Sequence, residues 1–349
     1  MTDRPQDSSR RLVIVTGSGR SGTSTVAGTL KYLGLAVPQP EVKADRTNPR
    51  GFFEPRWVVD FHKRLLATAR VRTLDARPEA LKLTGRVGSR PLVREELRTW
   101  LGPQLEQHQV VVKDPRTFWF EELWTATATS LGVAPSYLTM LRHPTEVVGS
   151  RDTHYLTELT AEERRSRETG ILAGWVNVVL VNEHLTRSAR RVFVHYPELI
   201  ESWRKAMVKV RDTLDLTFDT DLESDEPHQV DEFIDANLHR VRLTWDDLDV
   251  PPYLRVLAED VWQGLCALAD DPDDPTAKAA LDQARERYAV LHAQSAALVH
   301  DATTSAVQTA RRHARRQARL ELSRQQRTSP WTFARRAFGA ARALRDRRG

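Results

Sequence analysis

Residues 11–35 read RLVIVTGSGRSGTSTVAGTLKYLGL, and this stretch decides the fold. The run 11–16 is short and rich in β-branched residues, which is typical of a buried strand. Glycines and hydroxyl residues follow, and then Val26, Leu30 and Leu33 recur at the spacing of one helix face. A strand, a glycine loop and a helix in this order surround an anion with backbone N–H groups and a helix N-terminus. The stretch therefore predicts a phosphate-binding loop.

The predicted loop lacks one residue of nucleotide-hydrolysing P-loops. Those loops read G-x-x-x-x-G-K-[ST], and their lysine reaches the outer phosphates. Gly17 and Gly22 have this spacing, but Thr23 stands in the place of the lysine and Arg20 lies two residues before the second glycine. The change argues against ATP or GTP hydrolysis and favours another phosphorylated ligand. The residues expected to bind it are Gly19, Arg20, Ser21, Gly22, Thr23 and Ser24.

Alternating strand and helix patterns continue along the chain. Short apolar runs predict three more strands, over residues 109–114, 136–142 and 190–196. Helical patterns lie between them, over residues 94–107, 145–156 and 160–188. Strands that alternate with helices form parallel sheets covered on both faces. We therefore expect an α/β fold, a P-loop-like doubly wound parallel sheet flanked by helices, with ligands at the carboxyl ends of the strands.

The pattern breaks at Asp274, a good helix N-cap that is followed by Pro275 at the first helical position. From there to about Gln326 the sequence is alanine-rich and helical. We expect an α/β nucleotide-binding domain over residues 10–274 and a helical, arginine-rich C-terminal extension over residues 275–349.

Charge is divided unevenly along the chain. Thirteen arginines and two acidic residues give residues 311–349 a net charge of +11. The other 310 residues hold 39 basic and 45 acidic residues and carry −6. A mildly acidic body is a poor surface for nucleic acid, so no nucleic-acid partner is expected and only the tail could meet a polyanion.

The cysteine count and the hydropathy pattern limit the cellular compartment and the kinds of metal or disulfide site that we expect. The single cysteine, Cys266, cannot form an internal disulfide or a Cys-based zinc site. The eleven histidines show no convincing metal-ligand spacing, so no metal is expected. No stretch approaches the ~20 apolar residues of a membrane span, and the polar start MTDRPQDSSRR shows no secretory signal. These features predict a cytoplasmic protein.

The run RSGTST, residues 20–25, resembles the 5′-phosphosulfate-binding loop of sulfotransferases, commonly written K/R-S-G-T-T. These enzymes use 3′-phosphoadenosine 5′-phosphosulfate (PAPS). The resemblance covers about residues 10–245 and points to bacterial and carbohydrate-modifying members. It implies that Arg20 takes the place of the NTPase lysine and binds the 5′-phosphate and the bridging oxygen.

Two later segments extend the resemblance. LRHPTEVVGS, residues 141–150, resembles the family's 3′-phosphate site, an arginine at a strand end and a serine eight residues later. It implies that Arg142 and Ser150 bind the 3′-phosphate. VHYPELIESW, residues 194–203, resembles a segment whose tyrosine contacts the adenine, here Tyr196.

Sulfuryl transfer needs a base for the acceptor hydroxyl and positive charge at the leaving oxygen. The resemblance implies Arg20 and Lys113 for the charge. Small-molecule members read K-x-H at Lys113, but this chain has Pro115 in the place of the histidine. Other relatives take a glutamate from the loop after the first helix. Glu54, which adjoins two aromatic residues, is the preferred base.

Other residues and functions stay open at this point. Glu41 is the second candidate base, His62 is a third, and Asp114 with Arg116 could form a structural ion pair. An atypical P-loop kinase would need a Mg²⁺-binding acid at a strand end, for which Asp114 is available. A non-catalytic scaffold would bind the product nucleotide 3′-phosphoadenosine 5′-phosphate (PAP) or a membrane.

The acceptor is expected to be a sugar hydroxyl on a glycolipid or oligosaccharide. This rests on NPRGFFEP, residues 48–55, which is similar to a loop of bacterial and glycan-modifying members. In the tail, Trp331 and Phe338 share one face of a predicted helix and most arginines lie away from it. That pattern is typical of a basic helix in a membrane interface. Docking of the same residues on the acidic body is an equal alternative.

Overall fold

The computed structural model describes residues 10–152, 159–234 and 243–328. Within them lies a four-stranded parallel sheet of order β2-β1-β3-β4. Its strands are β1 (Arg11–Thr16), β2 (Gln109–Lys113), β3 (Pro135–Leu141) and β4 (Arg191–His195). The expected α/β fold with a parallel sheet flanked by helices is confirmed.

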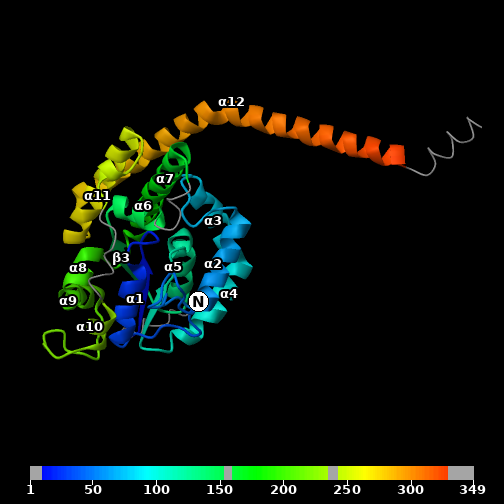
Figure 1. The fold of residues 1–349 in the computed structure, drawn as a ribbon. Coiled ribbons are helices and arrows are strands. Elements are labelled where there is room, and N and C mark those ends of the chain that lie inside the picture. The colour runs from blue at the N-terminus through cyan, green and yellow to red at the C-terminus, as the bar shows by residue number, and fades with distance from the viewer. Residues whose placement is uncertain (1–9, 153–158, 235–242, 329–349) are drawn as a thin grey trace, which may run out of the picture. The chain divides into compact units, whose positions relative to one another are not determined.

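Helices connect the strands and cover both faces of the sheet (Figure 1). Between β1 and β2 run α1 (Thr23–Tyr32), α2 (Arg56–Ala69), α3 (Ala80–Gly88) and α4 (Pro91–Gln104). Between β2 and β4 run η1 (Thr117–Phe120), α5 (Glu121–Ser130), α6 (Pro144–Asp152) and α7 (Ala161–Thr186). After β4 come α8 (Tyr196–Glu201), α9 (Trp203–Leu214), α10 (Gln229–Phe233), η3 (Trp245–Asp247), α11 (Pro252–Asp270) and α12 (Pro275–Thr328).

The alternation of side chains along β1 divides the interior into two cores. Leu12 and Ile14 pack with apolar residues of α2, α4, α5 and η1. Val13 and Val15 face the other way and pack with α1, α8 and α9. All four residues have no exposed surface. Both faces of β1 are therefore buried, which explains why its sequence is a continuous apolar run and does not alternate with polar residues.

The strand order creates a switch point at the carboxyl end of β1. The chain leaves β1 toward β2 on one side, and β3 then pairs with β1 on the other side. Connections that depart in opposite directions leave a crevice between the two strand ends, where ligands bind in this class of fold. The pairs Val15 with Lys113 and Thr16 with Thr139 lie side by side there.

Three expected strands end one residue earlier than the sequence predicted. β2 stops at Lys113, β3 at Leu141 and β4 at His195, so Asp114, Arg142 and Tyr196 lie just beyond the strands. Asp114 leaves the sheet because its carboxylate accepts the backbone N–H of Arg116 and closes a tight turn. The helix expected over residues 145–156 is α6, Pro144–Asp152, and residues 153–156 lie outside the described chain.

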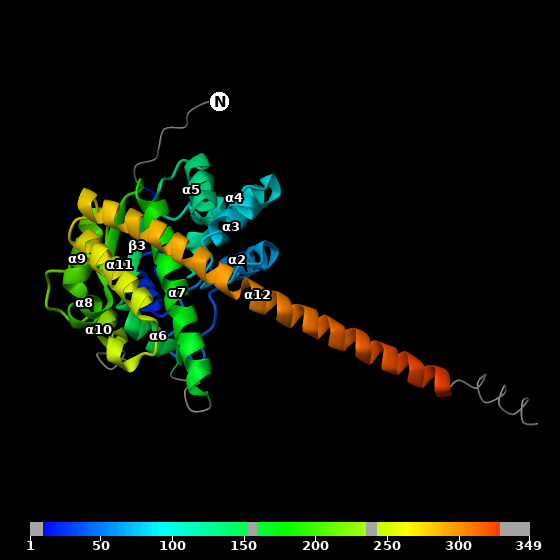
Figure 2. The same ribbon diagram turned by 90° about the horizontal axis from the view of Figure 1, so that it is seen from above.

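The helix predicted from Pro275 is α12, and Asp274 accepts hydrogen bonds from the backbone N–H groups of Thr276 and Ala277 at 2.8 and 3.3 Å. The chain divides into two compact units, Met1–Ala289 and Val290–Gly349. The expected boundary at residue 274 falls at the start of α12, upstream of this division. In the first unit α11 contacts α7 (Figure 2). The predicted membrane-facing segment, with Trp331 and Phe338, lies outside the described residues.

Candidate functional site

The glycine loop between β1 and α1 has the tight backbone that its sequence predicts. Gly17 and Gly22 have φ angles of 132° and 93°, and Arg20 has a φ of 79°. Ser21 closes the turn because its backbone N–H and its hydroxyl both donate to the carbonyl oxygen of Ser18, at 3.2 and 2.7 Å. Gly22 precedes α1, so the N-terminus of that helix points into the loop.

Gly22 is held against the ring of Tyr196. A β-carbon added to Gly22 would lie 2.2 Å from Cδ2 of Tyr196, far inside van der Waals contact. The ring is 4% exposed, and the guanidinium of Arg142 lies 4.8 Å from its centre. Burial raises the pKa of Tyr196, although the nearby charge of Arg142 opposes this shift. Tyr196, which was expected to contact adenine, is thus also a support for the loop.

The structure brings Arg142 and Ser150, the two residues expected to bind a 3′-phosphate, close to the loop. Arg142 follows β3 directly and donates from Nη1 to the backbone oxygen of Arg20 at 3.2 Å. Arg20 in turn donates from Nε to Oγ of Ser150 at 3.0 Å. Arg142 also pairs with Glu146, one helical turn on, at 2.8 Å. Residues that follow β1 and β3 therefore meet a residue of α6 at the switch point.

Two guanidinium groups lie close together in this cluster. Partial burial and the positive charge of Arg142 lower the pKa of Arg20. A bound anion would relieve both effects, because it would supply opposite charge at the place where two like charges meet. Both the electrostatics and the backbone of the loop are therefore suited to an anion.

Lys113 and Glu54 form a buried ion pair beside the loop. Nζ of Lys113 lies 2.6 Å from Oε1 of Glu54 and 2.9 Å from Oγ of Ser24. The two charged residues are 3% and 7% exposed. Phe53, the residue before Glu54, has a φ of 53°, and this left-handed conformation turns the chain toward Lys113. The sequence named both residues as candidates but did not predict that they touch.

Glu41 and His62 occupy different surroundings. Glu41 pairs with Lys31, in the last turn of α1, at 2.5 Å, so it sits by the end of α1 that faces away from the loop. His62 is fully buried and accepts the indole N–H of Trp124 at Nε2, 2.9 Å away. Its Nδ1 must then carry the proton, which it donates to Asp114 at 3.0 Å. A neutral imidazole with both nitrogens engaged is a core residue.

The structural ion pair of Asp114 and Arg116 is present, at 2.7 Å. Burial alone would raise the pKa of Asp114, but the hydrogen bond from His62 and the charge of Arg116 leave it below its usual value. The side chain of Asp114 has no exposed surface, and both of its carboxylate oxygens are engaged.

A polar group behind the loop was missed by sequence reasoning. Oγ1 of Thr16 and Oγ1 of Thr139 lie 2.8 Å apart, and Nδ2 of Asn182 donates to Thr139 at 3.3 Å. Oγ of Ser18 and Oδ1 of Asn182 are buried and find no partner among the described residues, and both residues line a cavity of about 10 Å³. Threonines at strand ends look like ordinary strand residues, so the sequence carried no signal for this group.

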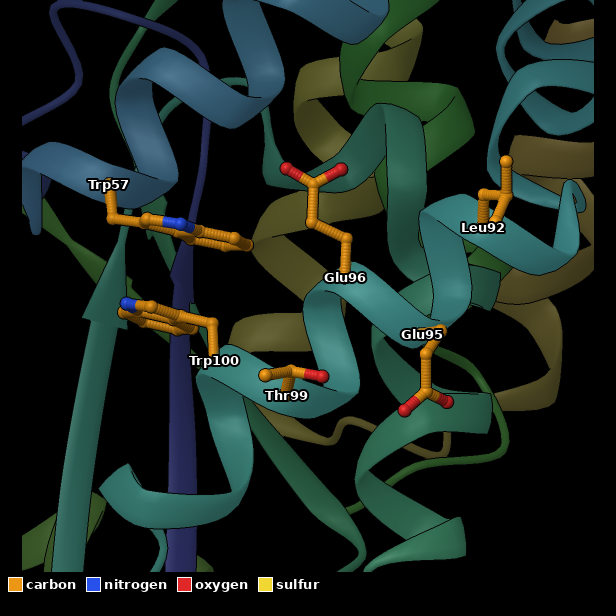
Figure 3. A pocket seen from close by; sticks show the side chains of 6 residues that line it. All are labelled: Trp57, Leu92, Glu95, Glu96, Thr99 and Trp100. Carbon is orange, nitrogen blue, oxygen red and sulfur yellow. The ribbon is translucent and has the colours of Figure 1, made fainter.

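A separate groove lies between α2 and α4 (Figure 3). Its lining residues are Trp57, Leu92, Glu95, Glu96, Thr99 and Trp100. Trp57 stacks on Trp100 at 4.6 Å and also on Phe61 at 4.6 Å. Both faces of Trp57 are therefore covered, and none of the predicted site residues lines this groove.

Within the described ranges, no group of three or more His, Cys, Asp or Glu side chains is placed to hold a metal ion. Among the helices described, none combines the length and apolar character that crossing a bilayer requires.

No family model and no curated protein matches the chain. Three similar solved structures are sulfotransferase domains or enzymes. The sulfotransferase domain of the olefin synthase of Synechococcus PCC 7002 has 17% identity and a TM-score of 0.39, covering 82% of this chain and 97% of that one. The sulfotransferase domain from the curacin biosynthetic pathway has 13% identity and a TM-score of 0.35, covering 61% and 76%.

The sulfotransferase STF1 of Mycobacterium tuberculosis H37Rv has 14% identity and a TM-score of 0.36, covering 64% of this chain and 70% of that one. Likeness at this level does not establish which reaction a chain catalyses.

The contact between Gly22 and Tyr196 makes a direct prediction. Gly22→Ala should lower the free energy of unfolding by at least about 2 kcal/mol, because the positive φ is strained and the methyl group meets the ring. Gly170→Ala is the matched control, since a β-carbon there meets nothing within 4 Å in α7. It should stabilise the protein by about 0.5–1 kcal/mol. Urea unfolding measures both, and equal stability of Gly22→Ala and wild type would contradict the packing described.

Proposed function

We propose that this protein is a PAPS-dependent sulfotransferase that moves a sulfuryl group to an acceptor hydroxyl. The observation that carries the proposal is the convergence of Arg20, Arg142, Ser150 and Tyr196 at one strand switch point. These residues lie on three separate segments of the sequence. They are also the positions that the motif resemblance had assigned to the 5′-phosphate, the 3′-phosphate and the adenine.

The charge layout fits a nucleotide with two separate anionic groups. Arg20 belongs to the glycine loop and is suited to a 5′-phosphosulfate beside the N-terminus of α1. Arg142 lies beyond it, at the end of β3, and is suited to a 3′-phosphate. Arg142 also keeps Glu146 as a partner at 2.8 Å, so a 3′-phosphate would share this guanidinium with that carboxylate.

When bound, the donor supplies an activated sulfuryl group: the acceptor oxygen forms a bond to sulfur, and the bond from sulfur to the bridging oxygen breaks, with the electron pair leaving on PAP. Glu54 is the proposed base and takes the proton of the acceptor hydroxyl on its carboxylate. Arg20 and Lys113 stabilise the negative charge that develops around the reacting centre. Glu54 is preferred to Glu41 because it contacts Lys113, whereas Glu41 pairs with Lys31.

The kinase alternative is weakened by the surroundings of Asp114. A kinase needs a strand-end carboxylate that can hold Mg²⁺. Asp114 is fully buried and gives one oxygen to His62 and the other to Arg116. Binding a metal there would require both contacts to break.

The wider setting of the enzyme is part of the proposal. We propose a sugar hydroxyl of a glycolipid or oligosaccharide as acceptor and a cytoplasmic location. Peripheral membrane contact through the basic tail remains a proposal, since residues 329–349 lie outside the described chain. Transfer of label from PAPS to a component of a cell extract, followed by identification of the product, would test the acceptor class.

The first prediction of this function concerns the nucleotide. PAP should raise the melting temperature without Mg²⁺, and AMP should do so less, because only PAP presents a 3′-phosphate to Arg142. Arg142→Ala should weaken PAP binding by roughly tenfold or more, the usual worth of a charge-assisted hydrogen bond, and leave AMP binding nearly unchanged. Arg98→Ala, an exposed arginine on α4, is the control. If the Arg142 variant still prefers PAP to AMP, the 3′-phosphate assignment is wrong.

The second prediction concerns the base. Glu54→Gln should keep PAP affinity within a few-fold and lower label transfer from PAPS by ~10²–10⁴, the usual contribution of a positioned base. Glu41→Gln serves as the matched control and should transfer label almost normally. The reverse result would move the role of base to Glu41, and full activity in both variants would remove a loop glutamate from the mechanism.

A further inference from the structure

The ammonium group of Lys113 has no unused hydrogen. A lysine carries three N–H donors, and Lys113 donates to Oε1 of Glu54 at 2.6 Å, to Oγ of Ser24 at 2.9 Å and to the carbonyl oxygen of Phe52 at 3.3 Å. An incoming anion can therefore bind Lys113 only if one of these three contacts is given up.

The contact with Glu54 is the shortest of the three and occupies an oxygen of the proposed base. Both charged side chains are almost fully buried, so each is stabilised by the opposite charge of the other while no ligand is present. A carboxylate oxygen that accepts a hydrogen bond from an ammonium group is poorly placed to accept a proton from an alcohol. In the described state Glu54 is thus restrained as a base.

A second anion near Lys113 weakens the attraction that holds Glu54 in the ion pair. Two anions at one ammonium group repel each other in a buried site. Ser24 belongs to the anion loop and keeps Lys113 next to it. The backbone of Glu54 is fixed independently, because its carbonyl oxygen accepts the N–H of Val42 at 2.8 Å and Glu41 bridges to Pro55. The carboxylate can therefore turn away from Lys113 by side-chain rotation alone.

We propose that Lys113 exchanges partners when the donor binds, and that this exchange makes the base available. This inference rests on the proposed sulfotransferase function. Lys113 leaves Glu54 for an oxygen of the sulfonate group and keeps its contact with Ser24. Glu54 is then free to accept the proton of the acceptor hydroxyl. The carboxylate is held by Lys113 until a sulfonate is in place, so donor binding precedes acceptor activation.

The exchange can be observed in the wild-type protein without any turnover. The full-length chain is labelled with ¹³C at glutamate side-chain carboxyl carbons, and the Glu54 signal is identified by its loss in Glu54→Asp, which keeps a partner for Lys113. The protein is then titrated with PAPS and, separately, with PAP, which lacks the sulfonate. We expect PAPS to shift the Glu54 signal and PAP to leave it in place. The Glu41 signal should not move with either nucleotide, since Glu41 pairs with Lys31.

The other outcomes separate this inference from the proposed function. If both nucleotides raise the melting temperature but the Glu54 signal stays fixed, the partner exchange is wrong and the sulfotransferase proposal stands. A shift with PAP as large as with PAPS would also overturn the exchange, because no sulfonate is then required. If neither nucleotide raises the melting temperature, the proposed function fails and the exchange fails with it.

Discussion

The close approach of Gly22 to the ring of Tyr196 is the contact on which the site depends. Tyr196 begins α8 directly after β4, and its ring has Gly22 on one side and the guanidinium of Arg142 within 4.8 Å of its centre. Three strand ends are thereby joined through a single buried ring. The carbonyl oxygen of Arg20 then lies within 3.2 Å of Arg142. A side chain at position 22 would push the ring away and disturb the placement of Arg20 and Arg142.

The charges around the loop are arranged in two unlike groups. Arg20 and Arg142 form a positive group in which burial and like charge already act on Arg20. Lys113 and Glu54 form the second group, an ion pair with no net charge. It contacts the first turn of α1 through Ser24. In the proposed function the first group binds the anionic groups of the donor, and the second supplies the base. Under the proposed function, nucleotide binding and proton transfer would take place at adjacent strand ends, where ligands bind in this class of fold.

The order of strands and loops along the chain was enough to predict that Arg20 and Arg142 lie close together. It was not enough to predict the ion pair of Lys113 and Glu54. Residues that follow parallel strands must meet at one edge of the sheet, so Arg20 and Arg142 could be placed from the strand pattern. Glu54 lies on a loop with no period, and its position follows from the left-handed φ of Phe53 and the packing of that ring on Phe233, 5.4 Å away. Such contacts are tertiary and leave no local signal. For the same reason the sequence could not show that Lys31 holds Glu41, nor that Asn182 reaches Thr139 from α7.

This chain lacks the loop lysine, but a lysine at the end of the neighbouring strand reaches the first turn of α1. In nucleotide-hydrolysing loops the lysine rises from the first turn of the helix, where this chain has Thr23, which is 4% exposed. Lys113 comes instead from the end of β2, and its ammonium group reaches Ser24 in that same first turn. An ammonium group placed in this way approaches the loop from the side, next to a carboxylate. A P-loop lysine neutralises phosphate charge as a point cation. Lys113 is already paired with a carboxylate, and under the proposed exchange of partners its contact with an incoming anion releases Glu54.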